Sequence, residues 1–300
     1  MATQLMPDQT SACIRMLPSR RVLRDTEVPI SVRITDQPDI DMHRHEFTEI
    51  VVVLKGVGDH LLDDDRFPIS AGDVLAIDQN HVHGYHNARE LRIANLLFKE
   101  SFLLAREPSL ARLAGYHALV HLEPGARKRL SFGGKLKLPT ESRILVEQRI
   151  YELRDELEQR SEGYQALSLS ILVDIIVRLC RLYGTSASDT QRNLLDMGYV
   201  VGYLESQYAQ QIEIRDLEPL VAMSSRTLMR RFSQATGTTP MQYLLRVRVT
   251  RAAHLLRTTR APMTDVAGDV GFSDSNYFSR QFRRIMGMSP TDYRRSEARR

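Results

Sequence analysis

Four side chains in the first third of the chain have the types and spacing of a small-molecule or metal site. They are His43, His45, Glu49 and His83. Residues two apart on a β-strand point to the same face, so a strand here would place the first three on one face. Neutral imidazoles and a carboxylate offer hydrogen-bond donors and acceptors at fixed angles, which suits the hydroxyl groups of a sugar. The same side chains are also ligands of divalent metals.

The last third of the chain repeats a pattern of arginine and apolar residues that suits DNA binding. The first copy is Ser224, Arg226, Leu228, Arg230, Phe232, Gly237, Pro240 and Tyr243, and the second, 50 residues later, is Asp274, Asn276, Phe278, Arg280, Phe282, Gly287, Pro290 and Tyr293. Each residue turns a helix by about 100°, so Arg226 and Arg230 lie opposite Leu228. Arginine can bind guanine through two hydrogen bonds, and asparagine can bind adenine in the same way. The repeat therefore predicts two DNA-reading helices.

The charge of the chain is distributed unevenly. Residues 224–300 contain 15 arginines and 5 acidic residues, a net charge of +10, whereas the whole chain carries +4. All five lysines lie within the first 137 residues. Because arginine binds phosphate and guanine in a bidentate manner, its concentration in the last third favours a nucleic acid as partner of that region.

The two sets of functional residues need different scaffolds. Residues 28–100 alternate apolar and polar positions and are rich in β-branched residues, with turns at Gly56, Gly58 and Gly72. This pattern predicts an antiparallel barrel or sandwich. Residues 141–160 and 165–183 then show helical spacing, and everything after the small polar residues Thr185 to Thr190 also reads as helical.

Each predicted reading helix follows a short helix and a tight turn. In the second copy the turn is Gly271-Phe272-Ser273, and in the first it is Ala222-Met223-Ser224. Glycine suits a turn with unusual dihedral angles, and Ser273 or Ser224 could cap the helix that follows. The pattern is that of a helix-turn-helix, present twice, at about 215–236 and 263–286. A helix from Pro240 to about Thr258 would separate the two units, whose reading helices could enter the major groove about 34 Å apart.

The segment from Leu194 to Tyr293 resembles the DNA-binding domain of AraC/XylS-type transcription regulators. The resemblance rests above all on residues 271–282 and on the run 287–293. It implies a seven-helix domain that binds double-stranded promoter DNA and usually activates transcription by touching RNA polymerase. Carried over by position, it assigns base reading to Arg226, Met229, Arg230, Asp274, Ser275, Asn276, Ser279 and Arg280.

Two residues of the first unit differ from the family pattern. Glu218 stands where a small alanine is usual, and Ala222 replaces the glycine of the turn. A carboxylate at position 218 must be solvated or paired.

Two short segments of the N-terminal half resemble the two cupin motifs. His43, His45 and Glu49 match the first, and His83 follows Gly72 as in the second cupin motif. In cupins three histidines and one glutamate hold a divalent metal inside a small β-barrel. The runs Glu49–Val53, Gly72–Val74 and Leu91–Asn95 also resemble the sensor halves of rhamnose- and arabinose-responsive AraC-type regulators. Three interpretations remain open for the cluster: an effector pocket, the metal site of an enzyme, or structural hydrogen bonds in a barrel.

The chain is thus expected to be a multidomain α+β protein. The expected parts are a cupin-like effector-binding barrel with an N-terminal arm (1–140), a helical dimerisation segment (141–184), a linker (185–193) and an AraC-type DNA-binding domain (194–300). For the first helix of the dimerisation segment, packing on its own barrel is an equally open alternative. The predicted function is that of a ligand-responsive activator of carbohydrate-utilisation genes, active as a homodimer and not an enzyme. The alternatives are a metal-dependent cupin enzyme fused to a DNA-binding module and a ligand-independent repressor.

The cellular setting is predicted to be the cytoplasm, away from membranes. Two cysteines, Cys13 and Cys180, are too few for a disulfide framework and fit a reducing compartment. The first ten residues lack the pattern of a signal peptide, and charges interrupt the longest apolar run, 167–182. No cofactor is expected, apart from a divalent metal if the cupin cluster is metallated.

Overall fold

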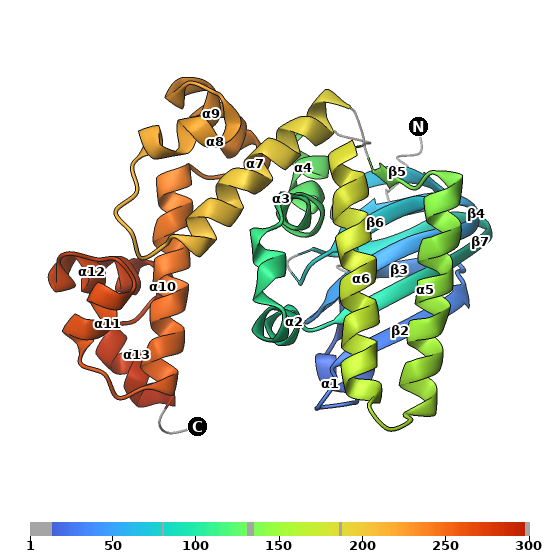
Figure 1. Ribbon diagram of the computed structural model, residues 1–300, viewed down its shortest axis with the longest axis horizontal. Coiled ribbons are helices and arrows are strands. Elements are labelled where there is room, and N and C mark those ends of the chain that lie inside the picture. Colours follow the sequence, from blue (N-terminus) through green and yellow to red (C-terminus); the bar gives the residue numbers. More distant parts are fainter. Residues whose placement is uncertain (1–13, 80, 131–134, 186–187, 298–300) are drawn as a thin grey trace, which may run out of the picture.

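The computed structural model describes residues 14–79, 81–130, 135–185 and 188–297. It consists of a β-rich N-terminal domain and an all-helical C-terminal domain, joined by one long helix (Figure 1). Cys13 and most of the expected N-terminal arm lie outside the described residues.

Eight strands form one antiparallel sheet, with a single parallel pair at its edge. They are β1 (Arg15–Leu17), β2 (Ile30–Asp36), β3 (Ile40–His45), β4 (Thr48–Leu62), β5 (Asp65–Ser70), β6 (Asp73–Ile77), β7 (His83–Phe98) and β8 (Leu136–Lys137). The expected cupin-like barrel is confirmed.

The sheet closes on itself because its two longest strands bend. One half of β7 pairs with β2 and the other with β3, while β4 pairs with β6 in its first half and with β5 in its second. Register shifts between β4 and β7 occur from Val53 to Asp59, and bulges of this kind bend a strand. Gly56 lies there with φ +79°, and a Cβ would be 2.2 Å from Glu90 O, so only glycine fits.

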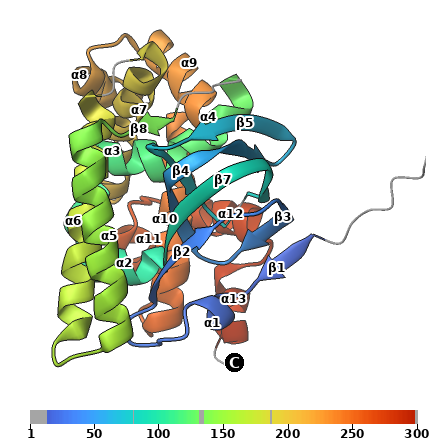
Figure 2. The ribbon, with the colours of Figure 1, turned by 90° about the vertical axis from the view of Figure 1, so that its right-hand side faces the viewer.

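Apolar residues fill both faces of the sheet, which explains the continuous apolar run at the start of β4. Val51 and Val53 point into the barrel and Ile50 and Val52 point outward, and all four are fully buried. The outer face is covered by helices. They include α5 (Thr140–Gln159) and α6 (Tyr164–Thr185), which lie side by side along the barrel (Figure 2). These two helices match the helical spacing at 141–160 and 165–183.

One short helix, α1 (Ser19–Val22), lies between β1 and β2. The other short helical segments follow β7 and lead towards the long helices. They are α2 (Glu100–Arg106), η1 (Pro108–Arg112), α3 (Ala114–Tyr116), the π-helical η2 (His117–Leu122) and α4 (Glu123–Leu130).

The C-terminal domain contains two helix-turn-helix units around a central helix. Its elements are α7 (Asp189–Ser206), η3 (Ile214–Leu217), α8 (Glu218–Val221), α9 (Ser225–Thr236), α10 (Pro240–Thr258), α11 (Met263–Asp269), α12 (Ser275–Met286) and α13 (Pro290–Glu297). The expected spacer helix is α10, and the expected reading helices are α9 and α12. No helix among these described segments has the length and hydropathy needed to cross a membrane.

The expected linker over residues 185–193 is shorter in the structure. Helix α6 ends at Thr185 and α7 begins at Asp189, so the second half of that range is helical. Ser188 caps α7 by accepting a hydrogen bond from Gln191 N at 3.1 Å. The sequence pattern failed here because serine and aspartate are typical of linkers and equally typical of the first turn of a helix.

The two domains are packed tightly against each other through α7. Gly198 of α7 faces Ala114 of α3, and a Cβ on Gly198 would lie 2.3 Å from Ala114 O. One apolar core consequently runs from the sheet through α7 to Leu228 and Phe232 of α9, whereas Phe278 and Phe282 of α12 belong to a separate core.

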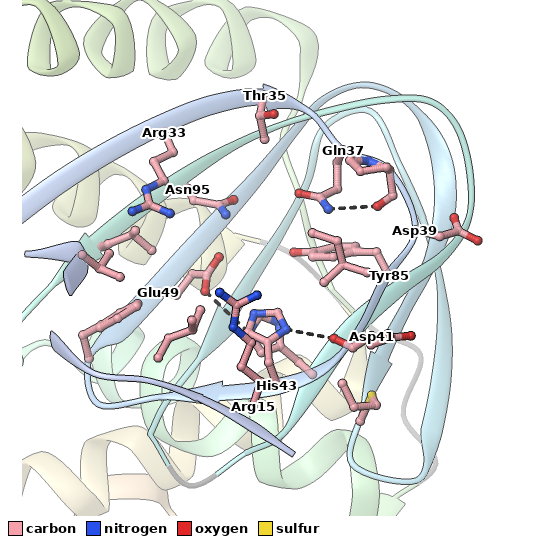
Figure 3. Close-up of a pocket in the computed structure, with 18 of the residues that line it drawn as sticks. Arg15, Arg33, Thr35, Gln37, Asp39, Asp41, His43, Glu49, Tyr85 and Asn95 are labelled. Atoms are coloured by element: carbon pink, nitrogen blue, oxygen red, sulfur yellow. Dashed lines mark hydrogen bonds and ion pairs between the residues drawn. The ribbon is translucent and has the colours of Figure 1, made fainter. Parts of the chain in front are cut away.

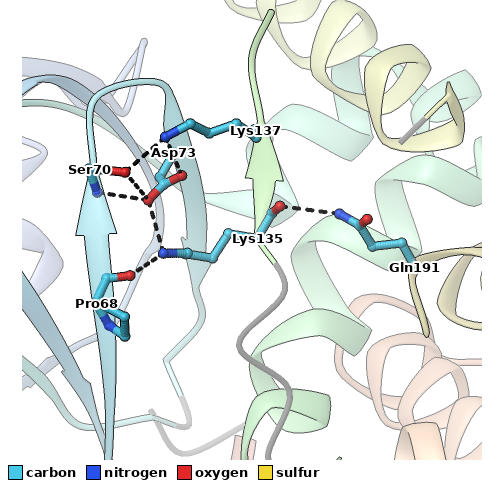
Figure 4. Close-up of polar contacts among 6 residues, drawn as sticks. All are labelled: Pro68, Ser70, Asp73, Lys135, Lys137 and Gln191. Carbon is cyan, nitrogen blue, oxygen red and sulfur yellow. Dashed lines mark hydrogen bonds and ion pairs between the residues drawn. The ribbon is translucent and has the colours of Figure 1, made fainter. Parts of the chain in front are cut away.

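A polar link also joins the edge of the sheet to α7 (Figure 4). The buried carboxylate of Asp73 lies 2.9 Å from Lys135 Nζ and 3.1 Å from Lys137 Nζ. The carbonyl oxygen of Lys135 accepts a hydrogen bond from Gln191 Nε2 at 3.2 Å. The short strand β8 therefore connects the sheet to the first turn of α7.

Candidate functional site

The reading helix of the second unit, α12, has one buried and one exposed face. Phe278 and Phe282 are fully buried. Asn276, Ser279 and Arg280 are exposed, as the repeat predicts, and Ser275 is half-buried. The exposed face therefore offers an amide, a hydroxyl and a guanidinium at neighbouring positions.

The reading helix of the first unit, α9, is built in the same way. Leu228 and Phe232 are fully buried, whereas Arg226, Met229 and Arg230 are exposed. Met229 is 42% exposed, an unusual position for a methionine. Its thioether can make apolar contact with a thymine methyl group but cannot donate a hydrogen bond.

Both helix-turn-helix turns contain a residue with positive φ, but the residue type differs between them. Gly271 has φ +86°, and Ala222 at the corresponding place has φ +49°. The left-handed region costs an L-residue about 1–2 kcal/mol, so Ala222 holds the first turn under strain. Ala222 is exposed and has room for its Cβ, whereas a Cβ on Gly271 would lie 2.8 Å from Ala209 O.

The caps of the reading helices differ from the expected serines. Ser224 makes no side-chain cap bond to α9; instead, Glu218 Oε1 accepts a hydrogen bond from Ser225 N at 2.6 Å and another from the Ser225 hydroxyl. These two bonds lower the pKa of Glu218. The carboxylate that departs from the family pattern is thus paired, and it links the two helices of the unit.

In the second unit the cap is Asp274, which the sequence assigned to base reading. Its Oδ1 accepts hydrogen bonds from Asn276 N at 2.7 Å and Tyr277 N at 3.2 Å. Ser273 does not cap α12. Asp274 therefore orients the first turn of the reading helix, with only its other oxygen left for further contacts.

The sequence pattern did not single out Tyr277, although it lies on the exposed side of α12. The residue is 43% exposed, and the guanidinium carbon of Arg280 lies 5.8 Å from the ring centroid. Such a contact restricts the arginine side chain. An exposed aromatic residue three positions before an arginine on a helix was the available signal.

One arginine of α10 binds the loop between α7 and the first unit. Arg248 Nε donates to Tyr208 O at 2.7 Å, and its Nη2 donates to Gln210 O at 2.6 Å. Gln211 Nε2 in turn donates to Gly271 O at 3.3 Å. The loop after α7 is thereby tied to α10 and to the turn of the second unit.

A pocket of about 980 Å³ opens in the N-terminal domain between the two curved halves of the sheet. Three of the four predicted side chains line it: His43, Glu49 and His83. Figure 3 shows His43 and Glu49 among the lining residues. Register explains their convergence, because His43 pairs with His83 across β3 and β7, and their rings are 4.3 Å apart. His45 is buried and does not line the pocket; its Nε2 lies 3.1 Å from Glu49 Oε2.

His45, Glu49 and His83 also have the geometry of a metal site. One ligand atom from each lies within 4.8 Å of the others, and all three residues are buried. His45 Nδ1 lies 2.7 Å from Phe47 O, to which it donates, and His45 Nε2 lies 3.1 Å from Glu49 Oε2. These residue types could hold a divalent metal, which would supply a positive charge to bind ligand oxygens.

Burial is the main reason why the pKa of His83 lies well below its usual value, and the neighbouring histidines His60, His43 and His45 lower it further. The imidazole is therefore neutral at pH 7. A neutral ring offers one donor and one acceptor, or one metal ligand.

The remaining polar lining of the pocket was not found from the sequence. It comprises Arg15, Arg33, Thr35, Gln37, Asp39, Asp41, Tyr85 and Asn95. Arg33 and Thr35 lie two apart on β2 and Gln37 follows directly after its end, so their period of two was the available signal.

Comparison with known proteins agrees with this architecture. A family model described as an AraC-like ligand binding domain matches residues 29–115, and one described as a helix-turn-helix domain matches residues 220–296. The chain is 32% identical to the HTH-type transcriptional activator RhaS of Escherichia fergusonii, over 84% of this chain and 86% of that protein. It is 28% identical to the HTH-type transcriptional activator RhaR of Mannheimia succiniciproducens, over 89% and 92% of the two chains.

Among solved structures, the chain is similar to the DNA-binding domain of AdpA in complex with a target DNA. The identity is 36% and the TM-score is 0.34, covering 35% of this chain and 96% of that one. The relatives RhaS and RhaR are named as transcriptional activators, not as enzymes. With a ligand-binding barrel ahead of a double helix-turn-helix, the chain belongs to the AraC family of DNA-binding transcription regulators.

Proposed function

We propose that this protein activates genes of carbohydrate use when a small polyhydroxylated effector occupies the barrel pocket. The observation that carries the proposal is the convergence of His43, Glu49 and His83 on one pocket of a domain packed directly against α7. Hydroxyl groups of a sugar would exchange hydrogen bonds with these side chains. The relatives RhaS and RhaR are named as activators, which supports activation of transcription and not repression.

For DNA recognition we propose that both reading helices enter the major groove of promoter DNA. The exposed side chains of α9 would read one half-site, and those of α12 the other. The proposed base-reading residues are Arg226, Met229, Arg230, Ser275, Asn276, Ser279 and Arg280, with Asp274 acting mainly as the cap.

The proposed partners beyond DNA are RNA polymerase and a second copy of the chain, in the cytoplasm, where promoter DNA is found. At the start of α5 the adjacent residues Ile144 (51%) and Leu145 (36%) are exposed, and Leu167 (49%) is exposed at the opposite end of the α5–α6 pair. The dimer proposal rests on the family resemblance, with Ile144 and Leu145 as candidate contacts. Sedimentation of the purified protein would test the dimer.

The proposed function is tested by a gel shift on the DNA upstream of the gene, with and without a panel of sugars. At least one sugar should change the affinity or the pattern of binding. If DNA binding is specific but no member of the panel alters it, a ligand-independent repressor becomes the better description.

Arg280→Ala is expected to weaken specific DNA binding by about 1–3 kcal/mol and to relax the preference at one base pair, because a bidentate contact to guanine is lost. Binding to operators substituted at each position measures both effects. Arg231→Ala is the matched control, since Arg231 points to Asp196 at 3.9 Å. An equal loss on every sequence would instead make Arg280 a phosphate contact.

His83→Ala should leave DNA affinity without effector intact and blunt the response to effector, because a donor and an acceptor leave the pocket. His83→Gln, which keeps hydrogen-bonding groups and volume, separates this effect from misfolding. His86→Ala serves as control, since His86 lies on the same strand outside the pocket lining. A normal response of the folded His83 variants would remove this residue from the effector site.

A further inference from the structure

Two arginines line the effector pocket without a carboxylate partner among the described residues. They are Arg15 of β1 and Arg33 of β2. Both are exposed as well as pocket-lining. An arginine on a convex surface is commonly solvated, but a guanidinium on the wall of a concave pocket presents its five donors to whatever binds there.

The strand register places the two arginines on different walls. Arg33 pairs with Asn95 across β2 and β7, so a guanidinium and an amide stand side by side on one wall. Arg15 pairs with His43 across β1 and β3, on the other wall. In Figure 3 the Arg33 and Asn95 side chains lie together on one side of the site, with Glu49 and His43 further along it.

Of the three acidic side chains that line the pocket, Glu49 and Asp39 have other partners, and Asp41 forms no ion pair with Arg15 or Arg33 among the described residues. Glu49 Oε2 lies 3.1 Å from His45 Nε2 and 3.6 Å from His83 Nε2. Asp39 accepts hydrogen bonds from Asn87 N at 3.2 Å and Ala88 N at 2.9 Å. No ion pair of the described residues neutralises Arg33, so the Arg33–Asn95 wall keeps a positive charge.

We infer that the effector is a monosaccharide that bears an oxyanion, either a carboxylate or a phosphate, which Arg33 binds with two parallel hydrogen bonds. Asn95 would donate a further hydrogen bond, and Arg15 would approach from the opposite wall. The hydroxyl groups would then face His43, Glu49 and His83. This inference rests on the proposed function, because it describes the ligand of the same pocket.

The test compares matched ligands on the full-length protein. Calorimetry and thermal shift would be run with D-galactose, D-galacturonate and D-galactose 6-phosphate, and with D-glucose, D-glucuronate and D-glucose 6-phosphate. At least one charged sugar should bind about tenfold or more tightly than its neutral partner, as expected for a charge-assisted bidentate contact. Comparison of the acid with the phosphate identifies which oxyanion the pocket takes.

Variants connect that preference to the proposed residue. Arg33→Gln should weaken binding of the charged sugar by about 10- to 100-fold and leave the neutral one unchanged. Arg33→Lys should retain part of the affinity, because lysine keeps the positive charge but cannot form the two parallel hydrogen bonds of a guanidinium. Arg44→Gln is the control, since Arg44 follows His43 on β3 and is exposed outside the pocket lining.

Two outcomes would overturn the inference: neutral sugars binding as tightly as charged ones with no effect of Arg33→Gln, or no charged sugar of either set binding at all. The gel shift keeps these failures apart from that of the proposed function. A neutral sugar that alters DNA binding would preserve the proposed function and refute the oxyanion. A charged sugar that binds through Arg33 but leaves DNA binding unchanged would support the oxyanion and refute the proposed function.

Discussion

Gly271→Ala is expected to destroy the second reading unit while leaving the first in place. The alanine would have to adopt φ +86°, and its Cβ would lie 2.8 Å from Ala209 O and 2.9 Å from Tyr208 O. Strain and backbone overlap together should cost about 2–4 kcal/mol. Since α12 starts directly after this turn, its base contacts would be lost together, lowering specific affinity by about 100-fold or more.

Gly287→Ala is the matched control for this prediction. Gly287 has a similar φ of +77°, but no atom lies within 4 Å of an added Cβ. The Gly287→Ala variant should therefore lose only the unfolding free energy that the positive φ costs an alanine. Unfolding curves and operator binding of both variants measure the difference, and equal effects would mean that the contact with residues 208–209 is unimportant.

Gly198→Ala is expected to separate α7 from the N-terminal domain. All three nearest atoms to an added Cβ belong to the backbone of Ala114, the closest at 2.3 Å, so no side chain can rotate away. Overpacking of this kind costs about 1–3 kcal/mol. DNA binding without effector should survive, because neither reading face contains this residue, but the response of DNA binding to effector should be lost.

The control for this variant is Gly184→Ala near the end of α6. There an added Cβ would meet only Leu195 Cδ2 at 3.7 Å, an ordinary contact. Limited proteolysis between the domains and effector-dependent gel shifts would follow both proteins. A Gly198→Ala protein that still responds to effector would show that this contact does not transmit the signal.

The sequence predicted those parts of the protein whose signals are local. The amphipathic faces of α9 and α12 follow from residues three and four apart. The grouping of His43, Glu49 and His83 was predicted from the spacing of the motifs, but the expected single strand for His43 and Glu49 is wrong: they lie on β3 and β4, and the register of the sheet brings them to His83 on β7. The family resemblance added the scaffold that holds each set. Both kinds of signal can be interpreted without the tertiary structure, because they depend on short segments of the chain.

Features that depend on distant pairing could not be predicted in this way. The lining by Arg33 and Asn95 requires the register of β2 on β7, which no local pattern states. The cap by Glu218 requires a contact seven residues along the chain, across a turn. The short linker was misjudged because the residues that cap α7 are also typical of flexible segments.

The division of the apolar core has a consequence for how the molecule comes apart. Helix α10 contributes Leu244 to the core shared with the N-terminal domain and Val249 to the core of the second unit. The boundary between independently packed bodies thus falls in the middle of a continuous helix and not at the expected linker. The first reading helix shares its core with the N-terminal domain, whereas the second packs on the far half of α10, from which Arg248 binds the loop after α7.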